Sequence, residues 1–104
     1  MSAFVISEVQ IIDEEAAAQY RELAAASIRA YGGRYLARGS EAHVAEGEPT
    51  SHRLVLCEFP SLARIREWYA SPAYAKALEY RDSALIRRLV FIDGVPEPDS
   101  PEIV

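Results

Sequence analysis

Two strand-like stretches, each joined directly to a helix signal, constrain the fold of this chain more than any other feature. Residues 31–39 place two glycines before the run Arg-Tyr-Leu-Ala-Arg-Gly, and residues 53–61 end an apolar run at Pro60 and Ser61. A glycine pair favours the left-handed backbone that ends a helix, and serine is a preferred helix N-cap. The sequence therefore predicts a helix before the first stretch, a helix after the second, and a hairpin between them.

Apolar periodicity predicts the other elements of the fold. Ser71 and Pro72 repeat a cap followed by a first-turn proline, so the second helix is expected to break and restart there, and Gly39 marks an expected bulge. The order β-α-β-β-α-β predicts a ferredoxin-like α+β fold, with a four-stranded antiparallel sheet and both helices on one face. The predicted strands are residues 4–12, 34–44, 52–59 and 87–95, and the predicted helices are residues 14–31 and the interrupted helix from residue 62.

Length and charge limit the domain count and the partners. The 104 residues suffice for one domain, which we place at residues 1–95, followed by a proline-rich acidic tail at residues 96–104 that we expect to be loose or disordered. Acidic residues outnumber basic ones 16 to 11 and the basic residues are scattered, which disfavours nucleic acid as a partner. The first apolar stretch is too short to span a bilayer, so we expect a cytoplasmic protein without a membrane partner.

No metal or cofactor motif stands out in the sequence. His43 and His52 flank the predicted hairpin turn without a cysteine or an acidic neighbour at metal-ligand spacing. The single cysteine, Cys57, lies inside an apolar strand pattern and is expected to be a small buried hydrophobe. The chain also lacks a nucleophile elbow, a phosphate-binding glycine loop and a dinucleotide fingerprint, so we predict neither metal nor cofactor.

The first predicted strand is apolar on both of its faces. Two helices can cover only one face of a sheet, and soluble monomers seldom expose a large apolar patch. We therefore expect a homodimer that covers the second face. The two sets are Val5, Val9 and Ile11, expected against the helices, and Phe4, Ile6 and Ile12, expected on the second face.

Strict alternation places charged residues among the apolar ones of that second face. These residues are Glu8, Arg34, Arg38 and Glu58. If the hairpin pairs Val44 with His52, Arg38 lies opposite Glu58, although a bulge at Gly39 would shift this register. One interpretation is a salt bridge that fixes register and dimer geometry. The other is a small-molecule cavity, in which Arg38 and Arg34 contact the ligand and Glu8 or Glu58 is the catalytic base.

Four aromatic residues and one arginine complete the set of candidate ligand contacts. Aromatic side chains with polar tips either pack in the core or line a pocket or dimer contact. Arg81 is late in the second helical segment, where a cation interacts favourably with the helix dipole or binds an anion in a pocket. The aromatic candidates are Tyr31, Trp68, Tyr69 and Tyr74.

These residues resemble a known family over about residues 3–95. The chain is similar to the family catalogued as domain of unknown function 1330, within the ferredoxin-like superfamily of dimeric α/β barrels. The turn after Glu46-Gly47 differs, because Glu48-Pro49 stands where the family pattern has a tryptophan. The pattern is carried by Tyr31-Gly32-Gly33-Arg34-Tyr35-Leu36, Arg38-Gly39, Glu46-Gly47, Arg53, Glu58-Phe59-Pro60-Ser61, Trp68-Tyr69, Ser71-Pro72, Tyr74 and Arg81.

The resemblance implies a homodimer in which two sheets face each other and enclose a barrel. It does not supply a reaction, since related families include cofactor-independent monooxygenases, lactone isomerases and haem enzymes, and fold alone does not decide function. Our leading hypothesis is a protein that binds a small, partly apolar molecule in a cavity between the sheet and the partner subunit. The alternatives are a cofactor-independent isomerase or monooxygenase that uses an inward carboxylate as base, and a structural or interaction dimer without ligand.

Overall fold

The computed structural model describes residues 2–95, and the tail predicted at residues 96–104 lies outside the described residues. The four strands form one antiparallel sheet in the order β2-β3-β1-β4, as the ferredoxin-like prediction requires. The elements are β1 (Ala3–Ile11), α1 (Glu14–Ala30), β2 (Arg34–Glu41), β3 (Arg53–Phe59), α2 (Leu62–Tyr69), α3 (Pro72–Ala84) and β4 (Leu85–Asp93).

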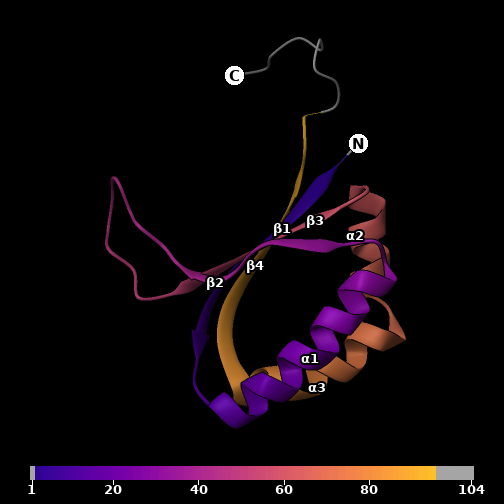
Figure 1. Cartoon of the computed structure of the whole chain (residues 1–104), viewed down its shortest axis with the longest axis horizontal. Coiled ribbons are helices and arrows are strands. Elements are labelled where there is room, and N and C mark those ends of the chain that lie inside the picture. Colours follow the sequence, from indigo (N-terminus) through magenta and orange to yellow (C-terminus); the bar gives the residue numbers. More distant parts are fainter. Residues whose placement is uncertain (1, 96–104) are drawn as a thin grey trace.

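The helices cover one face of the sheet and leave the other face open (Figure 1). Helices α1 and α3 lie side by side, α2 packs near one end of the sheet, and residues 42–52 project away from the body as a loop. Strand β2 ends at Glu41, so the predicted pairing of Val44 with His52 does not form. None of the helices in the described part of the chain has the length and apolar character needed to cross a lipid bilayer.

The helix ends follow the capping signals of the sequence. Asp13 accepts hydrogen bonds from the backbone N–H groups of Glu15 and Ala16, and Ser71 accepts one from Tyr74 at the start of α3. Gly32 has a φ of 81°, a conformation that glycine adopts without a steric penalty. The predicted break between α2 and α3 is confirmed, because Ser71 caps α3 and Pro72 occupies its first turn.

A dense aromatic cluster forms the core at the junction of α2, α3 and β3. Phe59, Ile65, Trp68 and Tyr74 are each at most 2 % exposed. The ring of Trp68 lies 4.2 Å from that of Tyr74 and 5.3 Å from that of Phe59, centroid to centroid. The indole nitrogen of Trp68 donates a 3.0 Å hydrogen bond to the hydroxyl of Ser27 on α1. This cluster holds α1, α2 and α3 on the sheet.

Strand β2 carries two irregularities: the first reverses the faces of Ala37 and Arg38, and the second restores the original alternation from Ser40 onward. The register shifts between Tyr35 and Ala37 and again between Arg38 and Ser40, and Gly39, in the second shift, has a φ of 75°. The bulge predicted at Gly39 is thus confirmed. The predicted contact of Arg38 with Glu58 is wrong, because Arg34 is the residue opposite Glu58, and Arg38 lies opposite Val55 on the helix-covered face.

Candidate functional site

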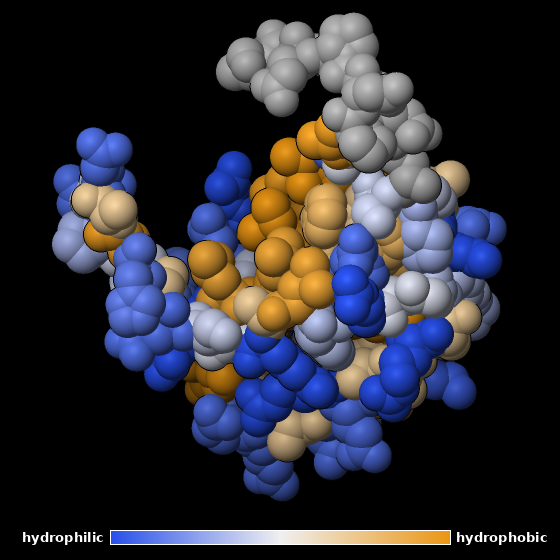
Figure 2. Space-filling view, turned by 45° about the horizontal axis from the view of Figure 1, so that its top comes forward, coloured by the Kyte–Doolittle hydropathy of each residue, from blue (hydrophilic) through white to orange (hydrophobic). Residues whose placement is uncertain are grey.

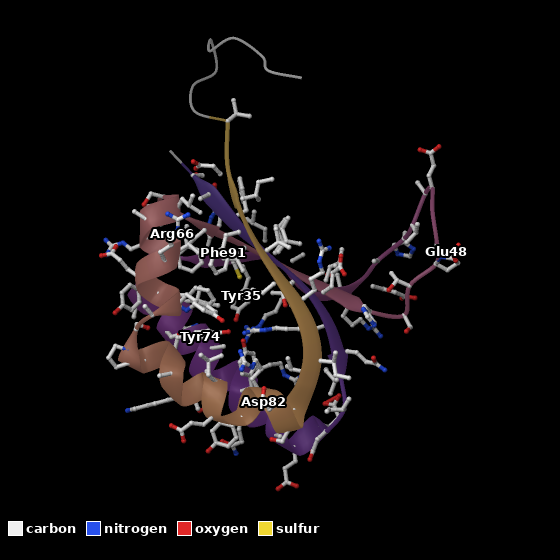
Figure 3. All side chains as sticks on the ribbon, turned by 180° about the vertical axis from the view of Figure 1, so that it is seen from behind. Tyr35, Glu48, Arg66, Tyr74, Asp82 and Phe91 are labelled. Carbon is white, nitrogen blue, oxygen red and sulfur yellow. The ribbon has the colours of Figure 1, made fainter. Side chains whose placement is uncertain are left out.

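A cavity of about 700 Å³ lies between the helix-covered face of the sheet and α1. It therefore lies on the opposite side of the sheet from the cavity that the sequence predicted. Tyr35 and Tyr74 both point into the space between the sheet and the helices (Figure 3). The side chains around the cavity come mainly from β1, α1, β3 and β4, and they include Val5, Ser7, Val9, Tyr20, Ala24, Tyr35, Arg38, Val55, Cys57, Trp68, Arg87 and Leu89.

A cluster of Tyr20, Tyr74 and Arg87 lies at the polar end of this cavity, where Tyr20 and Arg87 line the cavity and Tyr74 stands behind them. The two tyrosine oxygens lie 2.6 Å apart, and Arg87 donates a hydrogen bond from Nη1 to the oxygen of Tyr20. The guanidinium carbon of Arg87 lies 5.5 Å from the ring centroid of Tyr20 and 5.9 Å from that of Tyr74. Burial raises the pKa of both tyrosines, and on Tyr20 it outweighs the charge of Arg87, which lowers the pKa. Both hydroxyls are therefore neutral hydrogen-bonding groups.

A second arginine, Arg38, lines the same cavity from β2. Its guanidinium carbon lies 4.3 Å from the ring centroid of Tyr35, within the range of a cation–π interaction. Burial, followed by the neighbouring Cys57, raises the pKa of Tyr35 to about 12. Arg38 was expected on the open face by strict alternation, and the register shift after Tyr35 explains its position at the cavity.

The two carboxylates predicted as catalytic bases lie on the open face. Glu58 accepts a 2.9 Å hydrogen bond from Nε of Arg34 and forms an ion pair of 2.7 Å with its Nη2, and Glu8 lies 3.8 Å from Arg88. Hydrogen bonding from Ser2, together with Arg34, lowers the pKa of Glu58, which makes it a weaker base. Neither carboxylate lines the cavity, and Arg34 is likewise engaged on the open face.

The other predicted ligand contacts are divided between the cavity and its surroundings. Trp68 lines the cavity, whereas Tyr74 stands behind it and contacts Tyr20. Tyr69 and Arg81 border a second hollow of about 390 Å³, in which Arg81 lies 3.1 Å from Asp82. Tyr31 packs against the core at the end of α1.

Sequence reasoning missed Tyr20, Ser7 and Arg87 as cavity residues. A signal for Arg87 was present, because it precedes Leu89 by two residues and shares its face of β4. Ser7 lies on the same face of β1 as Val5 and is buried in the middle of the sheet. In the described range 2–95, no three His, Cys, Asp or Glu side chains gather as a metal-binding group.

Cys57 lines the cavity and is buried, as the sequence predicted. Burial raises the pKa of its thiol to about 11, so the folded protein holds it neutral. Because a raised pKa favours the neutral form, stability from this group is present below the unfolded thiol pKa and is lost as the pH rises through the folded pKa.

The neutral thiol of Cys57 should react slowly with iodoacetamide at pH 8, and unfolding in urea should accelerate the reaction at least about tenfold. Equal rates in the folded and unfolded protein, followed by mass spectrometry, would contradict this placement.

Residues 2–95 match the sequence profile of the family described as a domain of unknown function, DUF1330. The chain belongs to this family. No curated protein matches the chain in sequence.

Several solved structures share the fold of this family member. A protein of unknown function from Rhodopseudomonas palustris is 20 % identical, with a TM-score of 0.73 over 92 % of this chain and 84 % of that one. SnoaB, a cofactor-independent oxygenase from Streptomyces nogalater, is 7 % identical, with a TM-score of 0.64 over 95 % of this chain and 98 % of SnoaB. A candidate antibiotic biosynthesis monooxygenase from Caulobacter crescentus is 14 % identical, with a TM-score of 0.60 and 91 % of each chain covered. At these identities the likeness establishes the ferredoxin-like fold alone.

Proposed function

We propose that this protein is a homodimeric small-molecule-binding protein whose ligand occupies the cavity between the sheet and α1 of each subunit. The observation that carries the proposal is the cavity itself. Its volume of about 700 Å³ falls within the range of about 300–1,000 Å³ that is usual for ligand sites. Its walls are mostly apolar and Tyr20 and Arg87 form a polar end, which is the usual arrangement of a site that binds a partly apolar molecule.

The open face of the sheet supports the dimer. Figure 2 shows apolar residues gathered in a hollow beside the projecting loop. On this face Ile6 lies between Leu56 of β3 and Val90 of β4, and Leu36 and Ile92 are about half exposed. A second copy that packs its own sheet against this surface would remove the apolar side chains from water. The dimer also agrees with the architecture that the family resemblance implies.

An enzymatic role is the second candidate function. The cluster of Tyr20, Tyr74 and Arg87 supports it, because neutral hydroxyls and a guanidinium can stabilise an oxygen that gains negative charge. The structural likeness to a cofactor-independent oxygenase is compatible with this alternative. Among residues 2–95, Glu14 is the one carboxylate at the cavity that could serve as a base, and it lies 3.4 Å from Arg21. Ligand binding is therefore better supported than catalysis. It is also better supported than a purely structural dimer, which would leave the cavity without a role.

Titration of ¹⁵N-labelled protein with 2-naphthamide tests the binding proposal. This probe is planar, partly apolar and uncharged, so its binding does not depend on the arginines. We expect saturable chemical-shift changes at backbone amides around the cavity, such as those of Ser7 and Tyr35.

A further inference from the structure

We propose that the cavity selects an anionic ligand, an apolar carboxylic acid bound as its carboxylate, and that Arg87 is the residue that binds the carboxylate. The inference rests on the proposed function and adds the class of ligand and the residue that recognises it. Arg38, at the cavity wall formed by β2, is a second cation within the same site.

The cavity is strongly positive in a chain that is acidic as a whole. The protein has 16 acidic and 11 basic residues. Four arginines nevertheless line the cavity, against the single carboxylate of Glu14. Glu14 lies 3.4 Å from Arg21, and among residues 2–95 the remaining three form no salt bridge. These three are Arg38, Arg53 and Arg87. Arg38 and Arg53 are exposed to solvent, whereas Arg87 is partly buried, so Arg87 is the cavity cation that water screens least.

Arg87 is the best placed of these arginines to bind an anion. Its side chain extends from β4 under the helices, and its Nη1 donates to Tyr20. Its Nη2 is buried and has no hydrogen-bond partner in the described structure. An unpaired buried donor on a charged group is costly, and because Nη2 has almost no accessible surface, a small shift of the side chain is needed before a carboxylate pairs with the guanidinium through two parallel hydrogen bonds. Arg87 thus provides the guanidinium of a bidentate pair, and the ligand would provide the carboxylate.

The neighbouring ionisable groups do not supply the missing negative charge. Burial raises the pKa of Tyr20 and of Tyr74, and it raises the pKa of Cys57 to about 11. Near neutral pH these groups are uncharged, so they contribute hydrogen bonds but no counter-ion. The compensating anion has to enter with the ligand. A neutral ligand would leave the partly buried Arg87 without a counter-charge.

The remaining walls determine the character of the rest of the ligand. Val5, Val9, Val55 and Leu89 form apolar surface beside Arg87, and the indole of Trp68 borders the same space. Such walls favour a hydrocarbon or aromatic body over a sugar or a peptide. The carboxylate and the apolar body together define an aromatic or branched carboxylic acid.

Calorimetric titration with 2-naphthoate and 2-naphthamide tests this inference. The two probes share one ring system and differ in the charged group. Wild-type protein should bind 2-naphthoate at least about tenfold more tightly than 2-naphthamide, as expected when a charge-assisted hydrogen bond is gained. This comparison needs no variant, so it holds even if a substitution prevents folding.

Arg87→Met assigns the preference to one residue, because it removes the charge and keeps an extended side chain. It should abolish the preference by weakening 2-naphthoate about tenfold and leaving 2-naphthamide unchanged. Arg66→Met is the matched control, since it removes the same charge from an exposed position on α2 and should leave both affinities unchanged.

Three results would overturn the inference. Equal affinities of the two probes in the wild type would leave the binding proposal intact but show that the cavity does not select anions. Retention of tight 2-naphthoate binding by Arg87→Met would show that another residue binds the carboxylate. Failure of both probes to bind would reject the proposed function and this inference with it.

Discussion

Replacing Trp68 with alanine is expected to lower the free energy of unfolding by about 3–5 kcal/mol, a large part of the about 5–15 kcal/mol that is usual for a domain. The indole is 2 % exposed and packs against Phe59 and Tyr74. The substitution leaves a cavity where three helices and the sheet meet, and it removes the hydrogen bond that Ser27 accepts. Urea denaturation at a fixed protein concentration measures the loss.

Two further variants separate the packing of Trp68 from its hydrogen bond. Trp68→Phe keeps most of the ring volume but loses the hydrogen bond to Ser27, and we expect a loss of about 1–2 kcal/mol. Tyr69→Ala removes a neighbouring aromatic residue that is 38 % exposed, and its loss should stay below about 2 kcal/mol. A Trp68→Ala variant as stable as Tyr69→Ala would show that the aromatic cluster is not the core of this fold.

Replacing Ile6 with glutamate is expected to convert the proposed dimer into monomers. Ile6 lies at the centre of the open face, between Leu56 and Val90. An unpaired carboxylate buried between two sheets should weaken association at least about a hundredfold. Sedimentation of the wild type at micromolar concentration should give about twice the chain mass of 11.6 kDa, and the variant should sediment as a single chain.

Ala63→Glu controls for the added charge, because Ala63 is exposed on α2, which covers the opposite face of the sheet. This variant should remain dimeric. Circular dichroism should show that both variants keep the fold. A wild type that sediments as a monomer, or an Ile6→Glu variant that sediments as a dimer, would contradict the proposed interface.

Most of the fold was predictable because its signals are local. The cap at Asp13, the glycine terminator at Gly32 and the proline at the start of α3 act within a few residues of their own positions. Alternation also sorted β1 correctly, with Val5 toward the helices and Ile6 on the open face. The order of the elements then determined the sheet topology.

The site was less predictable because it depends on long-range register. One extra residue at Leu36 reverses the faces of Ala37 and Arg38 until the second shift restores the alternation, and no glycine marks the first shift in the sequence. The prediction consequently paired Arg38 with Glu58 and placed Arg38 on the open face, whereas it lies opposite Val55 on the helix-covered face. The contact between Tyr20 and Arg87 joins residues 67 positions apart, so no local pattern indicates it. Trp68 and Arg38 were predicted as ligand contacts, and both line the cavity.

Chemical-shift mapping of bound 2-naphthamide tests the central claim most directly, namely that a small molecule binds between the sheet and α1. We expect the largest changes at amides around the cavity, including those of Ser7, Tyr35 and Leu89, with saturation as the probe is added. Arg66, on the outside of α2, should not shift. Changes confined to the open face, around Leu36 and Ile92, or no saturable change at all, would contradict the claim.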